Sequence, residues 1–146
     1  MREVEYDVRL VAGPVEYQAP PFMAKGGGES SFLGRTREEE HASHGELVLL
    51  RYEAKESMAL KELDKLAKEA AVKHGLLFVR LLHSLGDVKV AQASVLVQVI
   101  GQHRKETFEA LKDIMDRLKK RVPIWKQEVW ADGTTWKDGL PVDPKA

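Results

Sequence analysis

The chain has 146 residues, in which 23 lysines and arginines balance 23 aspartates and glutamates, and it contains no cysteine. A formal net charge of zero excludes the broad positive field on which non-specific nucleic-acid binding depends. The lack of cysteine excludes disulfides, thiolate metal ligands and a cysteine nucleophile, so any sulfur chemistry requires sulfur brought by another molecule.

The first third of the chain predicts strands separated by two exposed loops. Four apolar residues alternate with charged ones, the period of a half-buried strand: Val4, Tyr6, Val8 and Leu10. Residues 13–31 are rich in proline and glycine and lack any period, so they predict a long mobile loop, and the polar run 38–45 predicts a second. Residues 32–37 and 46–52 predict further strands.

The middle of the chain predicts a helix followed by two strands. Ser57 is a suitable N-cap residue, and Gly75 ends the helix after His74. The apolar face of this helix is expected to hold Met58, Leu63, Leu66, Ala67 and Ala70. Residues 76–83 and 88–100 are rich in branched apolar side chains and predict two strands.

A second helix and a hairpin are predicted in the last third. The helix covers residues 104–121 and is ended by Pro123. Its core stripe is expected to contain Phe108, Leu111, Met115, Leu118 and Val122. Asp132-Gly133 between two short apolar runs predicts a β-hairpin with a type I′ turn, and residues 140–146 predict a loose tail.

These elements predict one α+β domain over residues 1–146, with a mainly antiparallel sheet and two main helices. The N-terminus lacks the apolar core of a secretory signal, and no stretch approaches the roughly 18 apolar residues that a membrane span needs. The sequence therefore predicts a cytoplasmic protein with no membrane partner.

Two residues at the start of the second helix form a candidate anion site. His103 and Arg104 lie where a strand passes into the helix, beside backbone N–H groups without intrahelical partners and at the positive end of the helix dipole. A phosphate would fit there. The alternative is that Arg104 faces solvent and His103 caps the turn, and the local pattern leaves both interpretations open.

The end of the same helix carries a candidate reactive amine. Lys119 lies at the margin of the predicted core stripe, where partial desolvation or a second cation such as Lys126 would make an amine more reactive near neutral pH. The alternative is that Lys119, Lys120 and Arg121 simply suit the negative end of the helix dipole.

Other catalytic classes have little support in the sequence. The five histidines show no metal-ligand spacing, so no metal is expected in this chain. The sequence also lacks the nucleophile motif GxSxG, a P-loop, and GxGxxG after a predicted strand.

A set of motifs in the last third closely resembles the molybdopterin synthase large-subunit family. They are His103-Arg104, Thr107-Phe108-Glu109-Ala110, Met115-Asp116, Leu118-Lys119, Val122-Pro123-Ile124-Trp125-Lys126-Gln127-Glu128, Asp132-Gly133 and Trp136. Weaker similarities are Phe32-Leu33-Gly34 with Arg37, Tyr52-Glu53-Ala54 with Met58-Ala59, and His83 with Gly86. The resemblance covers residues 27–137.

The resemblance implies an α/β-hammerhead fold and a homodimer whose two ends each bind a small ubiquitin-like sulfur carrier, giving a heterotetramer. The carrier's C-terminal thiocarboxylate would deliver sulfur to cyclic pyranopterin monophosphate, which agrees with the absence of cysteine. By resemblance, Lys119 and Lys126 are the catalytic amines. The implied substrate-binding residues are Arg37, His103 and Arg104 for the pterin and its phosphate, with the last two reaching across the dimer interface, and Phe32 and Met115 as pocket lining.

Two other functions are compatible with the same sequence. The first is a non-catalytic dimeric module that docks a ubiquitin-like tail, which would need a groove but not the pair Lys119 and Lys126. The second is a nucleic-acid binder that uses the cations of the second helix and the tryptophans. The neutral net charge and the apolar stripe of that helix argue against this second function.

Overall fold

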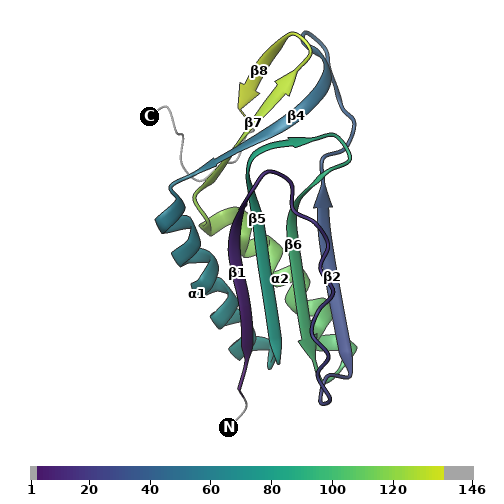
Figure 1. The fold of residues 1–146 in the computed structure, drawn as a ribbon, viewed down its shortest axis with the longest axis vertical. Helices are drawn as coiled ribbons and strands as arrows, with labels where there is room; N and C mark the ends of the chain where they lie inside the picture. Colours follow the sequence, from purple (N-terminus) through teal and green to yellow (C-terminus); the bar gives the residue numbers. More distant parts are fainter. Residues whose placement is uncertain (1–2, 137–146) are drawn as a thin grey trace.

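The computed structural model describes residues 3–136, which form eight strands and two helices (Figure 1). The strands are β1 (Glu5–Ala12), β2 (Gly28–Arg35), β3 (Glu40–His41), β4 (Gly45–Ala54), β5 (Phe78–Lys89), β6 (Ala93–Gly101), β7 (Ile124–Trp130) and β8 (Gly133–Trp136). The helices are α1 (Glu56–His74) and α2 (Arg104–Arg121). The predicted tail at 140–146, and with it the end of the predicted domain, lies outside the described residues.

The strands follow the order β2-β6-β5-β4-β7-β8, and all these neighbours are antiparallel. Strand β1 pairs in parallel with β5, and the short β3 pairs with β4. Strand β5 belongs to both halves of the sheet, because residues 78–83 pair with β6 and residues 86–89 pair with β4. Gly86 has a φ of 87°, a conformation that favours glycine, at the point where β5 leaves one half for the other.

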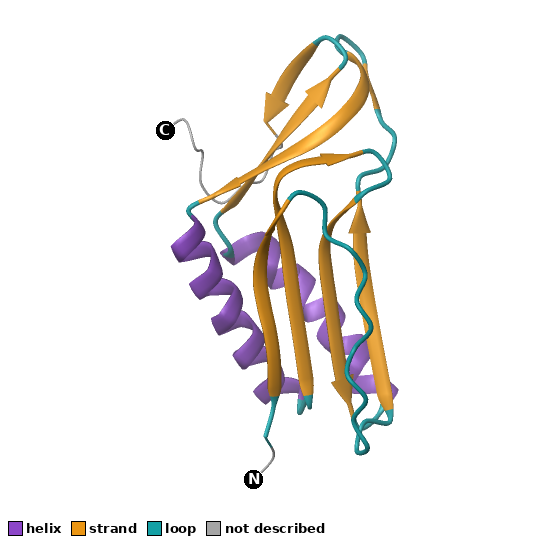
Figure 2. Cartoon of the chain, viewed as in Figure 1, coloured by secondary structure: helices purple, strands orange, loops and turns teal. Residues whose placement is uncertain are grey.

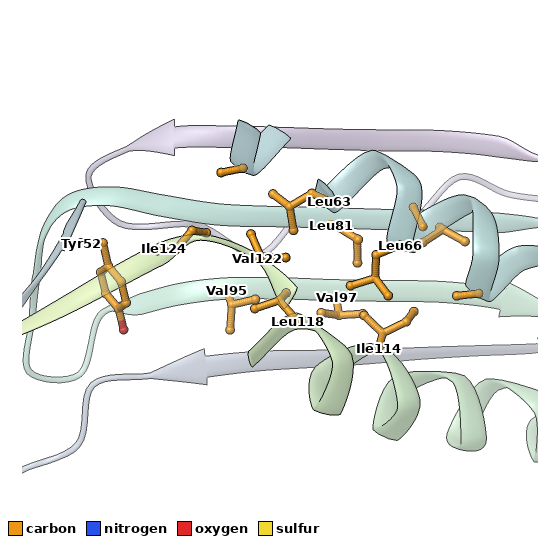
Figure 3. Packing of buried hydrophobic residues seen from close by; sticks show 14 of the residues in the cluster. Tyr52, Leu63, Leu66, Leu81, Val95, Val97, Ile114, Leu118, Val122 and Ile124 are labelled. Carbon is orange, nitrogen blue, oxygen red and sulfur yellow. The ribbon is translucent and has the colours of Figure 1, made fainter. Parts of the chain in front are cut away.

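Both helices cover the same face of the β1, β5, β6 and β2 half of the sheet (Figure 2). The main core lies between these layers and includes Leu63 and Leu66 of α1, Ile114 of α2, and Leu81 and Val97 of the sheet (Figure 3). These five side chains are essentially inaccessible to solvent. Burial of such aliphatic side chains stabilises the fold by about 1.5–3 kcal/mol each.

The opposite face of this half-sheet is covered by the loop 13–27 (Figure 2). Val15 packs on Leu82 and Leu96, and a second small apolar cluster receives Met23. The fully buried amide of Gln98 donates a hydrogen bond of 2.6 Å to the carbonyl of Gln18 and so ties the loop to β6. The loop therefore shields the β5 and β6 part of this face from water.

The predicted loops are longer than those observed. Residues 28–31 belong to β2, although the loop was predicted to continue to residue 31. The start of this strand has no alternation of apolar and polar residues, so the sequence pattern does not indicate it. Ser30 faces α2, and its hydroxyl donates a hydrogen bond of 2.7 Å to Thr107. Within the predicted loop 38–45, residues 40–41 pair with β4. The turn between β5 and β6 also lies later than expected, at 90–92 instead of 84–87.

Both helices lie where the sequence predicts them, but two details of α1 differ. The N-cap position is Lys55, which makes no side-chain capping bond, so the prediction of Ser57 is wrong. Met58, expected in the core, is 53% exposed because it lies on the first, outward-facing turn. Gly75 does end the helix, with the left-handed φ of 64° that the prediction required.

The core face of α2 is rotated from the predicted stripe. Its buried residues are Thr107, Ala110, Ile114 and Leu118, whereas Phe108 is 61% exposed. Small side chains at 107 and 110 let the helix lie close to the sheet, and Phe108 then points away from the core. Leu111 and Met115 are half-buried at the margin of the core.

The predicted C-terminal hairpin is confirmed, but its turn is not type I′. Trp130 pairs with Gly133, so the two loop residues are Ala131 and Asp132. A type I′ turn needs positive φ at both loop residues, and neither residue has it.

No helix within residues 3–136 is long and apolar enough to cross a membrane.

Candidate active site

The C-terminal end of α2 presents Lys119 and Met115 on neighbouring turns. Lys119 is exposed, and its ammonium makes no hydrogen bond or ion pair with any other residue in the described part of the chain. It is not partly desolvated as the sequence suggested, because the rotation of α2 carries it outwards. An exposed ammonium without a carboxylate partner is available to an anionic ligand.

Lys126 lies on β7, which leaves the same end of α2 after the turn at Pro123 (Figure 1). Its side chain is half-buried, and the residue pairs directly with Tyr52 of β4. Residues that face each other in an antiparallel pair project their side chains to the same side of the sheet. Lys126 and Tyr52 are therefore side by side.

A buried histidine lies behind these two residues. His83 of β5 is 6% exposed, and its ring meets the ring of Tyr52 edge-on at a centroid distance of 5.0 Å. Burial, together with the charge of Lys126, lowers the pKa of His83 to about 4, although a hydrogen bond to the Ser84 carbonyl opposes the shift. His83 is therefore neutral at physiological pH.

The end of β2 contributes the predicted residues Phe32 and Arg37. Phe32 is 41% exposed, and its ring lies over Gly34 on the side of the sheet that carries the helices. Arg37 follows the strand, and its guanidinium contacts the Glu39 carboxylate at 3.1 Å. The Arg37 side chain is highly exposed, so its ion pair with Glu39 is weak and an anionic ligand can compete for the guanidinium.

The remaining two predicted residues are at the other end of α2. His103 is the N-cap residue with an extended backbone and no side-chain capping bond, and its Nδ1 lies 3.4 Å from Glu106. Arg104 is exposed and has no side-chain partner within residues 3–136. The capping role offered as an alternative for His103 is thus not observed, whereas Arg104 does face solvent.

The sheet register shows which predicted residues share an end of the molecule. Gly34, two residues after Phe32, pairs with Val95, and Val95 pairs with His83. Three residues further along β5, Gly86 pairs with Tyr52, and Tyr52 pairs with Lys126. Phe32 and Lys126 therefore lie towards the same end of the molecule, and β7 follows the end of α2 there. Arg104 and Lys119 are 15 residues apart on one helix, which separates them by roughly 22 Å at the helical rise. One chain therefore does not bring all seven predicted residues around a single small molecule.

The other cations of α2 are mostly neutralised. Arg121 donates hydrogen bonds to Glu69, the shortest being 2.7 Å, and Arg117 contacts Asp113 at 2.9 Å. Lys112 contacts Asp116 at 3.0 Å. Trp125 and Trp130 are buried. The pairing of these cations and the burial of these rings argue against the nucleic-acid function.

No group of three or more possible metal ligands comes together among residues 3–136. The prediction that the chain holds no metal cofactor stays a prediction.

Sequence reasoning named five residues at the lysine-bearing end but not His83 and Tyr52 as members of the site. A single histidine inside an apolar strand is usually interpreted as a core residue. The sequence does contain one indication of its importance. His83 follows Leu81 and Leu82 in a buried strand, and a polar ring in such a strand needs a specific hydrogen-bond partner.

The fold and this cationic cluster define a class of small α+β proteins with a surface suited to anionic ligands. The chain belongs to the MoaE protein family, whose model matches residues 10–121. The family resemblance inferred from the sequence is therefore confirmed.

Two curated relatives illustrate the similarity. The molybdopterin synthase catalytic subunit of Pyrococcus abyssi is 38% identical over 137 residues, which is 90% of this chain and 91% of the relative. Molybdopterin synthase catalytic subunit 1 of Aedes aegypti is 40% identical over 120 residues, covering 77% of this chain and 74% of the relative.

Solved structures have the same fold. Molybdopterin synthase from Staphylococcus aureus superposes with a TM-score of 0.77 at 29% identity, covering 94% of this chain and 98% of that one. A complex of subunits 1 and 2 of molybdopterin-converting factor from Helicobacter pylori gives a TM-score of 0.65 at 24% identity, with 78% of this chain and 73% of that chain covered. The predicted α+β hammerhead fold is confirmed.

Proposed function

We propose that this chain is the catalytic subunit of a molybdopterin synthase. It transfers one sulfur from the C-terminal thiocarboxylate of a small carrier protein to cyclic pyranopterin monophosphate, and does so twice per product to form the dithiolene. Membership of the MoaE family carries this proposal, and the catalytic-subunit names of relatives that match most of the chain support it. The chain contains no cysteine, as expected if the sulfur comes from a carrier.

The lysine-bearing end is proposed to perform the transfer. Lys119 and Lys126 attract the anionic thiocarboxylate, neutralise the charge that develops as its sulfur attacks a pterin carbon, and supply a proton to the oxygen that leaves that carbon. Water then cleaves the thioester between sulfur and carrier, which releases the carrier as a carboxylate. Arg37 binds the pterin, and Phe32 and Met115 line its pocket. The half-buried position of Lys126 supports this role, because a partly dry site strengthens electrostatic interactions.

His103 and Arg104 are proposed to complete the site of a second copy of the chain. They cannot reach the lysines of their own chain because α2 separates the two groups by roughly 22 Å. A two-fold homodimer would place the phosphate-binding end of one protomer beside the lysine-bearing end of the other, twice per dimer. With one carrier at each site, the assembly is a heterotetramer. The Helicobacter pylori protein of the same fold likewise forms a complex between subunits 1 and 2 of its molybdopterin-converting factor.

The direct test is reconstitution from purified components. The protein is mixed with a thiocarboxylated carrier and cyclic pyranopterin monophosphate, and the dithiolene product is measured after oxidation to its fluorescent form. Product that requires both additions is expected. No product in the presence of a detectable carrier complex would favour the non-catalytic docking module, and the absence of both would contradict the proposal. The cytoplasmic location stays a prediction.

The shared site is tested by mixing two inactive variants. In a mixed dimer of Lys119→Ala and Arg104→Ala chains, one site carries both changes and the other site carries neither. Random exchange of protomers is therefore expected to restore about a quarter of the wild-type rate. A mixture that stays as inactive as each variant alone would show that each site is built from one chain. Mixing Lys119→Ala with Lys126→Ala is the control. Both lysines of a site come from the same protomer, so each site of the mixed dimer carries one change and no intact site can form.

A further inference from the structure

His83 has a defined proton position that follows from its contacts. Its Nδ1 lies 2.8 Å from the carbonyl oxygen of Ser84. A carbonyl oxygen can only accept a hydrogen bond, so Nδ1 carries the proton. Because the ring is neutral, Nε2 is left unprotonated, and it is an acceptor in a buried place.

Tyr52 connects this acceptor with Lys126. The Tyr52 ring contacts His83 edge-on, and Tyr52 faces both Gly86 of β5 and Lys126 of β7 across the sheet. Figure 3 shows Tyr52 at one end of the row of core residues, beyond Ile124 and Val95. Its hydroxyl is held by a hydrogen bond with Ser94. The ring therefore has little freedom to move.

Lys126 is close enough to His83 for its charge to act on the imidazole. A lysine side chain has a flexible four-carbon stem, and a reacting amine needs a fixed position to be effective. A protonated imidazole would repel the ammonium, whereas a neutral imidazole with its lone pair at Nε2 attracts it. Burial keeps His83 in the neutral form at the pH of the reaction.

We propose that His83 is a positioning residue for Lys126, and that its unprotonated Nε2 and the Tyr52 ring together hold the Lys126 ammonium in its reactive position. This inference rests on the catalytic role proposed for Lys126. His83 itself does not touch the substrate. Its effect is therefore on the turnover step and not on substrate binding.

Two substitutions separate the two ring nitrogens. His83→Asn can keep a donor for the Ser84 carbonyl but lacks a group at the place of Nε2. His83→Gln can put an amide oxygen near that place. We expect kcat of His83→Asn to fall about tenfold, with the KM for the pterin and the Kd for the carrier within about twofold of wild type. His83→Gln is expected to recover part of kcat.

A measurement independent of activity is the rate at which an amine reagent modifies Lys126, relative to Lys119 in the same molecule, determined by peptide mass spectrometry. Release of Lys126 is expected to change this ratio at least about threefold in His83→Asn. The ratio can be measured even if the reconstitution assay yields no product, so failure of the proposed function is distinguishable from failure of this inference. Tyr52→Leu removes the ring and is expected to change the ratio in the same direction, which keeps the test open if His83→Asn does not fold.

Ser84→Ala is the matched control. It removes a partly buried hydrogen bond of 2.6 Å from the Ser84 hydroxyl to the Gly13 carbonyl but keeps the main-chain carbonyl that His83 uses. It is expected to lower the melting temperature and to leave both kcat and the labelling ratio unchanged. An unchanged ratio in folded His83→Asn would overturn the inference, and so would an equal change in Ser84→Ala, since general loosening would then explain both.

Discussion

Replacing Lys119 by alanine is expected to lower the rate of dithiolene formation about a thousand-fold, because the change removes a cation and proton donor used in the transition state. The fold should be unaffected, since Lys119 is exposed and has no side-chain partner among residues 3–136. The rate is measured in the reconstituted reaction with saturating carrier. Dimerisation and carrier binding, followed by light scattering and calorimetry, should match the wild type.

The neighbouring Lys120 provides the control for this variant. It is exposed, carries the same charge and lies in the same last turn of α2. If Lys119 acted only through the helix dipole, then Lys120→Ala would lower the rate by a similar factor. We expect Lys120→Ala to retain most of the activity. Near-normal turnover by Lys119→Ala would contradict the proposed catalytic role.

Acidification from pH 7 to pH 4 is expected to remove about 3 kcal/mol of the free energy of unfolding through His83 alone. Burial lowers the pKa of His83 from 6.5 to about 4 in the folded protein, so the unfolded chain takes up a proton first as the pH falls. This stability is fully present above pH 6.5 and is lost progressively down to about pH 4. Urea unfolding at a series of pH values, at one protein concentration, measures it.

The aspartates of the fold act in a separate, more acidic range. A hydrogen bond from Arg51 lowers the pKa of Asp87, and one from Arg9 lowers that of Asp7, so the stability due to these groups is lost only below about pH 3.8. His83→Asn has no imidazole to titrate and should lose about 3 kcal/mol less than the wild type between pH 7 and pH 4. Equal losses in the two proteins would contradict this assignment.

The elements that the sequence predicts best are those with a strong local period. The limits of α2 are those predicted, because a polar turn and Pro123 bound a clear helical pattern. The start of β2 was missed, since Gly28 to Ser31 have no apolar alternation and become a strand only by pairing with β6. The face of α2 was misjudged because apolar character ranks Phe108 above Thr107, whereas close packing on the sheet favours the smaller residue.

The candidate site was predictable only in part. The resemblance named Lys119 and Lys126, and the structure places both near the end of α2. Local patterns do not reveal that Arg104 and Lys119, which are proposed to act on the same substrate, lie at opposite ends of α2. His83 was recognised only as part of a weaker motif and was not named as a site residue, because its significance depends on Tyr52 and Lys126, which come from other strands.

In the proposed dimer, helix α2 is also a spacer of fixed length. Adding one residue between Arg104 and Lys119 would turn one end against the other by about 100° and lengthen the helix by about 1.5 Å. In a symmetric pair of chains that error would occur at both sites at once. An insertion within this helix should accordingly impair both sites, whereas an insertion in the segment 13–27 would leave the spacing of Arg104 and Lys119 unchanged. The proposed two-chain site thus makes the number of residues in α2 as strict a requirement as the identity of the cations at its two ends.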